Sequence, residues 1–205
     1  MQALTKRMIY TPDGEKTISV HASDIIELDV DIDIMTVSAF YRNYHNTRGT
    51  LFEALYMQNI DVPLMANYPE IDLREQCNIW LSKETLSSAK LPIKRIGCIE
   101  MSSSPLDGGD WKKLKDTMLI SIKAYFRMLE IASIMGIGIE RIVLPPLGSG
   151  KQRIPVDFIM PSVINESIRF LKNNNAAKDI MIVTNNHSIA FNIAKILEQY
   201  MVPEK

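Results

Sequence analysis

The chain has 205 residues, of which 46% are hydrophobic and 23% are charged, and its formal net charge is −1. This composition predicts one globular domain over residues 1–205, with enough apolar residues to bury a full core. The near-neutral charge argues against a protein that works mainly by attracting nucleic acid, and no apolar run approaches the length of a membrane span.

The first predicted element is a β-hairpin. Residues 6–10 resemble a short edge strand, residues 11–14 (Thr-Pro-Asp-Gly) carry a strong turn signal, and residues 16–22 alternate apolar and polar side chains. The chain leaves the second strand at Asp24. His21 is expected to point outward from this strand.

The next predicted strand, within residues 29–40, becomes continuously apolar after Asp33. A continuous apolar run is typical of a central parallel strand that is covered on both faces. Asp29, Asp31 and Asp33 alternate at its start, a pattern more typical of a solvated face or a turn than of a metal cluster.

A polar loop at residues 41–49 leads into a predicted helix. Thr50 is placed to cap this helix, with Glu53 reaching back as in a capping box. Leu51, Phe52 and Leu55 form its apolar stripe. Residues 60–76 contain two prolines and predict no clear element.

The middle of the chain predicts two strands and the longest helix. The strands are expected at residues 78–82 and 93–101, and the polar loop 102–109 follows the second strand. Apolar residues then recur at three- and four-residue steps from Leu114 to Ala132, which indicates a helix with one buried face.

The last third alternates strands with helices. Residues 142–144 form an apolar strand before a glycine-rich turn, and a helix follows Pro155, with Asp157 as its expected cap. Residues 179–184 predict a buried strand, and a last helix is expected to start at Ser188. The fold class is therefore α/β, a three-layer α/β/α sandwich with a mixed, mostly parallel sheet.

Cysteine usage and the N-terminal sequence bear on the cellular setting. Cys77 and Cys98 have no metal-ligand spacing, and the N-terminus lacks the pattern of a signal peptide. The absence of a disulfide framework favours a cytoplasmic protein. Neither a metal nor a cofactor is expected.

The turn at residues 145–153 joins a strand to a helix through Gly148-Ser149-Gly150. Such a turn places backbone N–H groups around a phosphate. A P-loop does not fit, because Pro145 stands where its first glycine belongs and Gln152 follows Lys151. A G-x-G-x-x-G fingerprint is also absent. An ordinary tight connection is the plainer interpretation of the glycines alone.

Ligands of open α/β sheets bind at the carboxyl ends of the strands, so the loops at those ends form the candidate site. These loops follow the predicted strands at residues 23–25, 38–50, 102–109, 147–153 and 185–188. Two of them contain glycine and run into helices. They predict a clamp in which backbone amides hold a diphosphate.

Several segments resemble the macro domain family. They are residues 18–25, residues 33–39, Gly49 before a helix, and the Pro-Pro-Leu-Gly-Ser-Gly loop that leads to Pro155. The resemblance implies binding of ADP-ribose or a related NAD-derived nucleotide, and in some members hydrolysis of ADP-ribosyl links. The implied partners are a small nucleotide and an ADP-ribosylated protein or other protein partner.

The resemblance also implies roles for particular residues. Asp24 would accept from the adenine amine, the Ile25 N–H would meet the ring, and the two glycine loops would surround the diphosphate. Gly148→Val is then expected to block the ligand and to leave folding cooperative. The candidate ligand-binding residues are Asp24, Ile25, Ser38, Ala39, Phe40, Arg48, Gly49, Thr50, Leu51, Leu147, Gly148, Ser149, Gly150, Lys151, Gln152 and Asn185.

The chain departs from the hydrolytic members of the family at Phe40. That position is expected to carry an Asn that holds the distal ribose, and residues 46–49 also lack the family's Gly-Gly run. Arg48 would add a positive charge to the phosphate site. These departures favour binding over hydrolysis, and no catalytic residue is assigned.

Three functions stay open at this point. The first is a reader or sensor of ADP-ribose-like nucleotides, the second an ADP-ribosyl hydrolase, and the third a protein-interaction scaffold. A hydrolase would draw its acid or base from Asp24, His45 or the 102–110 loop. A Ser–His hydrolase using Ser38 or Ser149 has little support, since no G-x-S-x-G elbow is present.

Overall fold

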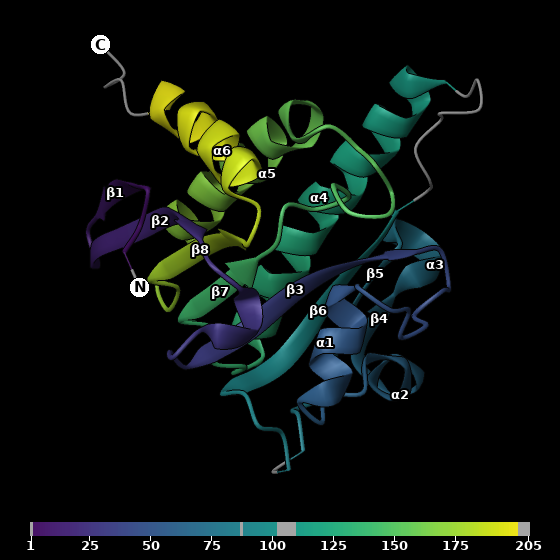
Figure 1. Ribbon diagram of the computed structural model, residues 1–205. Helices are drawn as coiled ribbons and strands as arrows, with labels where there is room; N and C mark the ends of the chain where they lie inside the picture. Colours follow the sequence, from purple (N-terminus) through teal and green to yellow (C-terminus); the bar gives the residue numbers. More distant parts are fainter. Residues whose placement is uncertain (1, 87, 102–109, 201–205) are drawn as a thin grey trace.

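The computed structural model describes residues 2–86, 88–101 and 110–200 (Figure 1). The predicted loop at residues 102–109 lies outside these residues. The strands are β1 (Thr5–Thr11), β2 (Gly14–Ala22), β3 (Ile32–Phe40), β4 (Pro69–Leu73), β5 (Ile79–Ser82), β6 (Ile93–Met101), β7 (Arg141–Leu144) and β8 (Asp179–Thr184). The helices are η1 (Ile25–Glu27), α1 (Leu51–Met57), α2 (Val62–Asn67), α3 (Arg74–Cys77), α4 (Trp111–Ile134), α5 (Val156–Asn173) and α6 (His187–Gln199).

The strands form one mixed sheet in the order β1-β2-β8-β7-β3-β6-β5-β4. The five strands from β2 to β6 in this order run parallel to one another. β1 at one edge, and β5 and β4 at the other, pair antiparallel. The predicted mixed, mostly parallel sheet is confirmed. The carboxyl ends of the five parallel strands therefore lie at the same edge of the sheet.

Helices cover both faces of the sheet, as Figure 1 shows, which confirms the three-layer sandwich. Buried side chains of α4, α5 and α6 pack with one face, and those of η1, α1 and α2 pack with the other. Successive strand residues alternate between the two cores: Ile34 belongs to the first and Met35 to the second. None of the helices in the described ranges is long and apolar enough to cross a membrane.

Residues 60–76 contain elements that the sequence did not reveal. Asp61 caps α2 by accepting from the N–H of Leu64 at 3.0 Å, and Pro63 fits in the first turn, where its missing N–H has no intrahelical partner. Pro69 begins β4, which lies at the edge of the sheet, where a proline removes no ladder bond. The prolines that obscured the pattern thus occupy tolerated positions.

Two helix starts differ from expectation. α5 begins after Pro155 without a side-chain cap, and Asp157 lies inside its first turn, where a negative charge favours the helix dipole. α6 begins at His187, one residue before the expected start, and is capped by Asn186, whose Oδ1 accepts from the N–H of Ile189 at 3.1 Å. Either way, the predicted helices form within two residues of their expected starts.

The carboxylate of Asp33 is buried at the start of β3, with the residue only 6% exposed. It accepts from Lys94 Nζ at 2.7 Å and from the backbone N–H groups of Glu140 and Arg141, each at 2.8 Å. This carboxylate therefore joins β3 to the segment that enters β7. Within the described part of the chain, no cluster of His, Cys, Asp or Glu could hold a metal ion.

Candidate functional site

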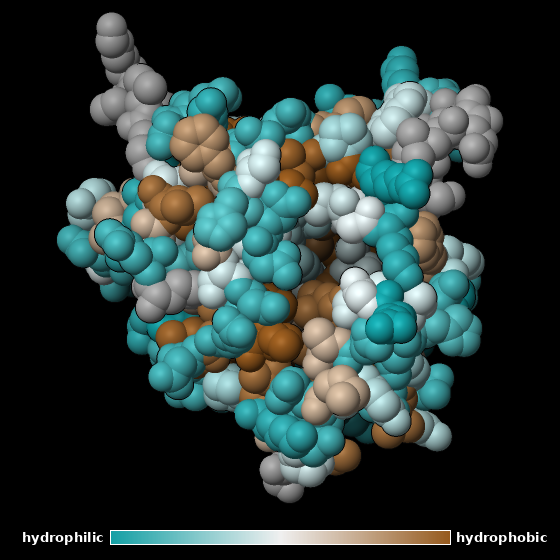
Figure 2. All heavy atoms as spheres, viewed as in Figure 1, coloured by the Kyte–Doolittle hydropathy of each residue, from teal (hydrophilic) through white to brown (hydrophobic). Residues whose placement is uncertain are grey.

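A cavity of about 670 Å³ lies at the carboxyl ends of β2, β3, β7 and β8, beside α1. On the face seen in Figure 2, hydrophobic residues lie in a hollow near the middle, and hydrophilic residues surround it. The segments after these strands and the first residues of α1 line the cavity. All predicted site residues border it except Arg48, Leu147 and Gly148.

These three exceptions have identifiable causes. Leu147 is buried in the core on the α4–α6 side of the sheet, and the Arg48 side chain is exposed outside the cavity wall. Gly148 is buried within its own turn. Its N–H donates to Ser38 Oγ at 3.3 Å, and its carbonyl accepts from the N–H of Ile154 at 2.9 Å. Gly148 thus shapes the turn and does not itself border the cavity.

Beyond Gly148, the turn presents unused backbone donors. In the described ranges, no protein acceptor takes the N–H groups of Gly150, Lys151 and Gln152, all of which border the cavity. The side chain of Gln152 is buried and donates to the carbonyl of Ala39 at 2.8 Å, which ties the turn to the end of β3. Three amides of one turn suit an oxyanion, and Lys151, which also borders the cavity, carries a positive charge.

A second group of unused polar atoms follows β2. Asp24 Oδ1 caps η1 by accepting from the N–H of Ile26 at 3.2 Å, which leaves the other carboxylate oxygen available. The N–H of Ile25 has no acceptor among the described residues. One donor and one acceptor thus lie side by side at the cavity wall, the pairing that the edge of a purine base requires.

The first glycine loop offers fewer donors than the sequence indicated. Thr50 caps α1 as expected, since its Oγ1 accepts from the N–H of Glu53 at 3.4 Å. Glu53 Oε2 reaches back to the N–H of Gly49 at 2.7 Å, one residue before the expected position. The N–H of Thr50 donates to the carbonyl of Thr47 at 3.1 Å. The Gly49 amide is therefore already occupied by a carboxylate.

The histidines do not form a Ser–His pair in the cavity. His21 is 6% exposed, so the expectation that it points outward is wrong, and burial lowers its pKa. Its Nε2 lies 2.8 Å from Ser19 Oγ. Ser149 Oγ donates to the carbonyl of Pro146 at 2.7 Å, and Ser38 accepts from Gly148. Of the three histidines, only His45 borders the cavity.

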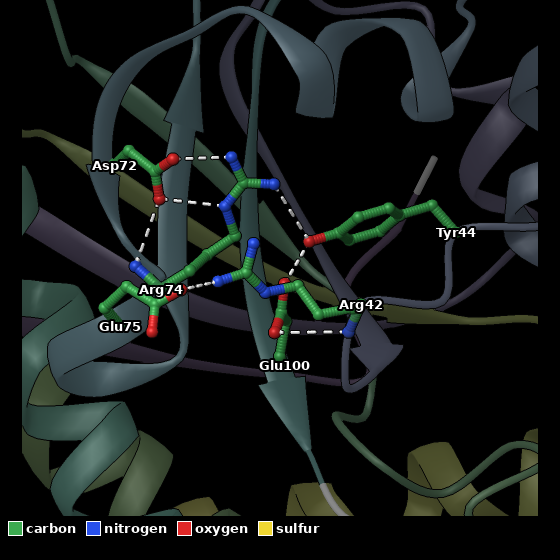
Figure 3. A network of polar contacts seen from close by, with 6 residues as sticks. All are labelled: Arg42, Tyr44, Asp72, Arg74, Glu75 and Glu100. Carbon is green, nitrogen blue, oxygen red and sulfur yellow. Dashed lines mark hydrogen bonds and ion pairs between the residues drawn. The ribbon is translucent and has the colours of Figure 1, made fainter.

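A polar network that sequence reasoning missed holds the loop between β3 and α1 (Figure 3). Glu100, near the end of β6, is 2% exposed and accepts from the hydroxyl of Tyr44 and, at 3.3 Å, from the N–H of Arg42. Arg74 donates to the same hydroxyl at 3.4 Å and forms an ion pair with Asp72. The Tyr44 ring packs edge-on against a buried tryptophan.

This network positions one wall of the cavity. The residues next to Tyr44 in sequence, Asn43 and His45, both border the cavity. Burial, together with the hydrogen bond to Glu100, raises the pKa of Tyr44 above its ordinary value, so the hydroxyl stays protonated and continues to donate.

We expect Tyr44→Phe to lower the free energy of unfolding by about 1.5–3 kcal/mol, because a buried carboxylate loses a donor. Chemical denaturation of the wild type and the variant measures the difference. Tyr10→Phe is the matched control, since Tyr10 is 73% exposed. Equal effects of the two substitutions would show that the network contributes nothing to stability.

Comparisons with known proteins identify the fold. No protein-family model and no curated protein matches the sequence. The Oceanobacillus iheyensis macrodomain with MES bound is 13% identical, with a TM-score of 0.67 over 96% of this chain and 97% of that chain. The macrodomain of the same organism with ADP is 12% identical, with a TM-score of 0.65 over 96% of each chain.

A structure from a second organism gives the same result. The Trypanosoma brucei macrodomain in complex with ADP-ribose is 15% identical, with a TM-score of 0.60 over 88% of this chain and 68% of that chain. At such low identity the similarity concerns the fold alone. The strands and helices of this chain are arranged as in a macrodomain, and the chain has the macrodomain fold.

Proposed function

We propose that the cavity binds ADP-ribose or a related NAD-derived nucleotide, and that the chain is a reader or sensor of that ligand. The proposal rests on two sets of polar atoms that border one cavity and have no partner for hydrogen bonding among the described residues. Asp24 and Ile25 lie after β2, and residues 150–152, whose amides have no acceptor in the described part of the chain, lie after β7. A nucleotide carries a base edge and phosphates that match these two groups.

The chemistry of the walls supports a nucleotide. Asp24 would accept from the exocyclic amine of adenine, while the N–H of Ile25 would donate to a ring nitrogen. Apolar side chains, among them Val37 and Phe52, supply the surface that a base and sugar need. The amides at residues 150–152 would hold a phosphate.

The structural neighbours support the same ligand class. One similar macrodomain was solved with ADP and another with ADP-ribose. This chain shares their fold, which makes ADP-ribose the first ligand to test on it.

Hydrolysis is the second candidate, because His45 and Asp24 both border the cavity. Phe40 also borders it, at the position where the resemblance places the Asn that holds the distal ribose. We therefore propose binding without turnover. Incubation with an ADP-ribosylated protein tests this point, and release of free ADP-ribose would favour the hydrolase.

We expect Asp24→Asn to lower the affinity for ADP-ribose by about tenfold to a hundredfold, which corresponds to the loss of one hydrogen bond to a charged group. Asparagine keeps an oxygen to cap η1 but offers an amide in place of the second acceptor. Isothermal titration with ADP-ribose and with ribose 5-phosphate measures both affinities. The affinity for ribose 5-phosphate should change little. Asp29→Asn, at an exposed position outside the cavity, is the control.

Two results would contradict these assignments. The absence of heat with millimolar ADP-ribose would defeat the proposed function and favour a protein-interaction scaffold. Equal losses for ADP-ribose and ribose 5-phosphate in Asp24→Asn would defeat the adenine role of Asp24 while leaving nucleotide binding intact.

A further inference from the structure

The cavity continues past the proposed phosphate position. Residues 24–25 follow β2 and residues 150–152 follow β7, and β8 lies between these two strands in the sheet. A ligand that runs from the first group to the second next meets the end of β3, because β3 is the following strand. Phe40, Asn43 and His45, at and just after that end, all border the cavity. A third chemical group of the ligand would therefore lie against these residues.

The segment that follows β3 is held by residues outside the cavity wall. Of residues 42–47, the odd-numbered ones border the cavity and the even-numbered ones do not. The buried carboxylate of Glu100 accepts from the N–H of Arg42 at 3.3 Å and from the hydroxyl of Tyr44, as Figure 3 shows. These contacts fix alternate residues of the segment, so the residues between them keep their places at the cavity wall.

This part of the wall combines two aromatic rings with a hydrogen-bond donor. Phe40 is partly exposed, and no aromatic ring of the described residues stacks on Phe40 or His45. The N–H of Asn43 donates to the carbonyl of Phe40 at 2.9 Å, which places the two residues across one tight turn. Asn43 Oδ1 accepts from the N–H of His45 at 3.3 Å, and in the described ranges no protein acceptor takes its side-chain NH2.

We propose that the ligand carries an aromatic group beyond its diphosphate, and that Phe40, Asn43 and His45 bind this group. A phenylalanine ring offers no hydrogen bond to a sugar hydroxyl, but it offers a face on which a planar ring stacks. The NH2 of Asn43 can donate to a carbonyl or a ring nitrogen of that group. The ligand class is therefore ADP-ribose with an aromatic ring on its distal ribose, as in NAD+. This inference rests on the proposed nucleotide function and specifies the far end of the ligand.

The test is isothermal titration of the wild type with AMP, ADP-ribose and NAD+. We expect NAD+ to bind about fivefold to tenfold more tightly than ADP-ribose, because only NAD+ carries the aromatic ring. Phe40→Leu keeps an apolar side chain but removes the ring. It should lower the affinity for NAD+ by about fivefold to tenfold and change the affinity for AMP by less than about twofold. Phe191→Leu is the control, because Phe191 is 57% exposed and lies outside the cavity wall.

The outcomes separate this inference from the function on which it depends. If the wild type binds ADP-ribose at least as tightly as NAD+, the aromatic group is wrong and the proposed function stands. If Phe40→Leu leaves the affinity for NAD+ unchanged, or lowers the affinities for NAD+ and AMP equally, the role of Phe40 is wrong. If the wild type binds none of the three nucleotides, the proposed function falls, and this inference falls with it. The comparison of ligands on the wild type needs no variant, so it decides the question even if Phe40→Leu unfolds.

Discussion

Gly148→Val is expected to lower the free energy of unfolding by about 2–5 kcal/mol, the sum of backbone strain and overpacking. Gly148 has a φ of +71°, a conformation that a β-branched residue rarely adopts. A Cβ at this position would lie 2.8 Å from Ile154 Cδ1 and 3.3 Å from Ile154 Cβ. Ile154 is 2% exposed and packs in the core, so it has little room to move.

The same substitution should abolish nucleotide binding, but indirectly. Displacement of Gly148 breaks two hydrogen bonds, the one that its N–H donates to Ser38 Oγ and the one that its carbonyl accepts from the N–H of Ile154. These bonds hold the turn whose later amides border the cavity. The structure thus changes the reason expected from the sequence, which was a ligand blocked by the side chain in an unaltered fold.

Gly136→Val is the control for Gly148→Val. Gly136 also has a positive φ, +89°, but a Cβ there would meet nothing within 4 Å. The Gly136→Val variant should lose stability through backbone strain alone, and it should bind ADP-ribose as the wild type does. Chemical denaturation and ADP-ribose titration measure both effects, and a Gly148→Val protein as stable as the wild type would contradict the structural role.

Asp33→Ala is expected to lower the free energy of unfolding by about 2–4 kcal/mol. The substitution leaves the N–H groups of Glu140 and Arg141 without their acceptor and Lys94 without its ion-pair partner. Losing the partner of a buried polar group costs more than the bond itself contributes. Asp29→Ala, at an exposed position, should change stability by less than about 0.5 kcal/mol.

The contribution of Asp33 also predicts a pH dependence. Burial raises the pKa of this carboxyl, but the hydrogen bonds from Lys94, Arg141 and Glu140 outweigh it, so the folded pKa lies below the ordinary value of 3.8. The stabilisation is therefore fully present above the unfolded pKa and is lost as the pH falls through the folded pKa. Melting temperatures of wild type and Asp33→Ala should converge in acid, and a constant difference would contradict this assignment.

The sequence predicted those elements of the fold that have a clear local pattern of apolar residues. The continuous apolar run of β3 appears as expected, because this strand is buried on both faces along most of its length. The stripe of α4 appears as expected, because its buried residues recur at the helix period. α3 and β4 were missed because they are short. α3 has four residues and β4 has five, too few for a period to appear.

The position of the site at the carboxyl ends of the strands could be predicted from the topology. Contacts between residues far apart in the sequence could not. The rule that ligands bind at carboxyl strand ends located the loops that border the cavity. The contact of Glu100 with Tyr44 joins residues 56 positions apart, and no local pattern reports it. Likewise, the sequence showed a capping box at Glu53, but only the structure shows that its carboxylate takes the Gly49 amide.

In the proposed complex, the nucleotide base lies at Ile25 and a phosphate lies at residues 150–152. Amide chemical shifts recorded by NMR during an ADP-ribose titration test it most directly. We expect the largest changes at Ile25, Gly150, Lys151 and Gln152, whose N–H groups lack acceptors among the described residues. We expect little change in the C-terminal half of α5. Unchanged shifts at these four amides with saturating ADP-ribose would contradict it.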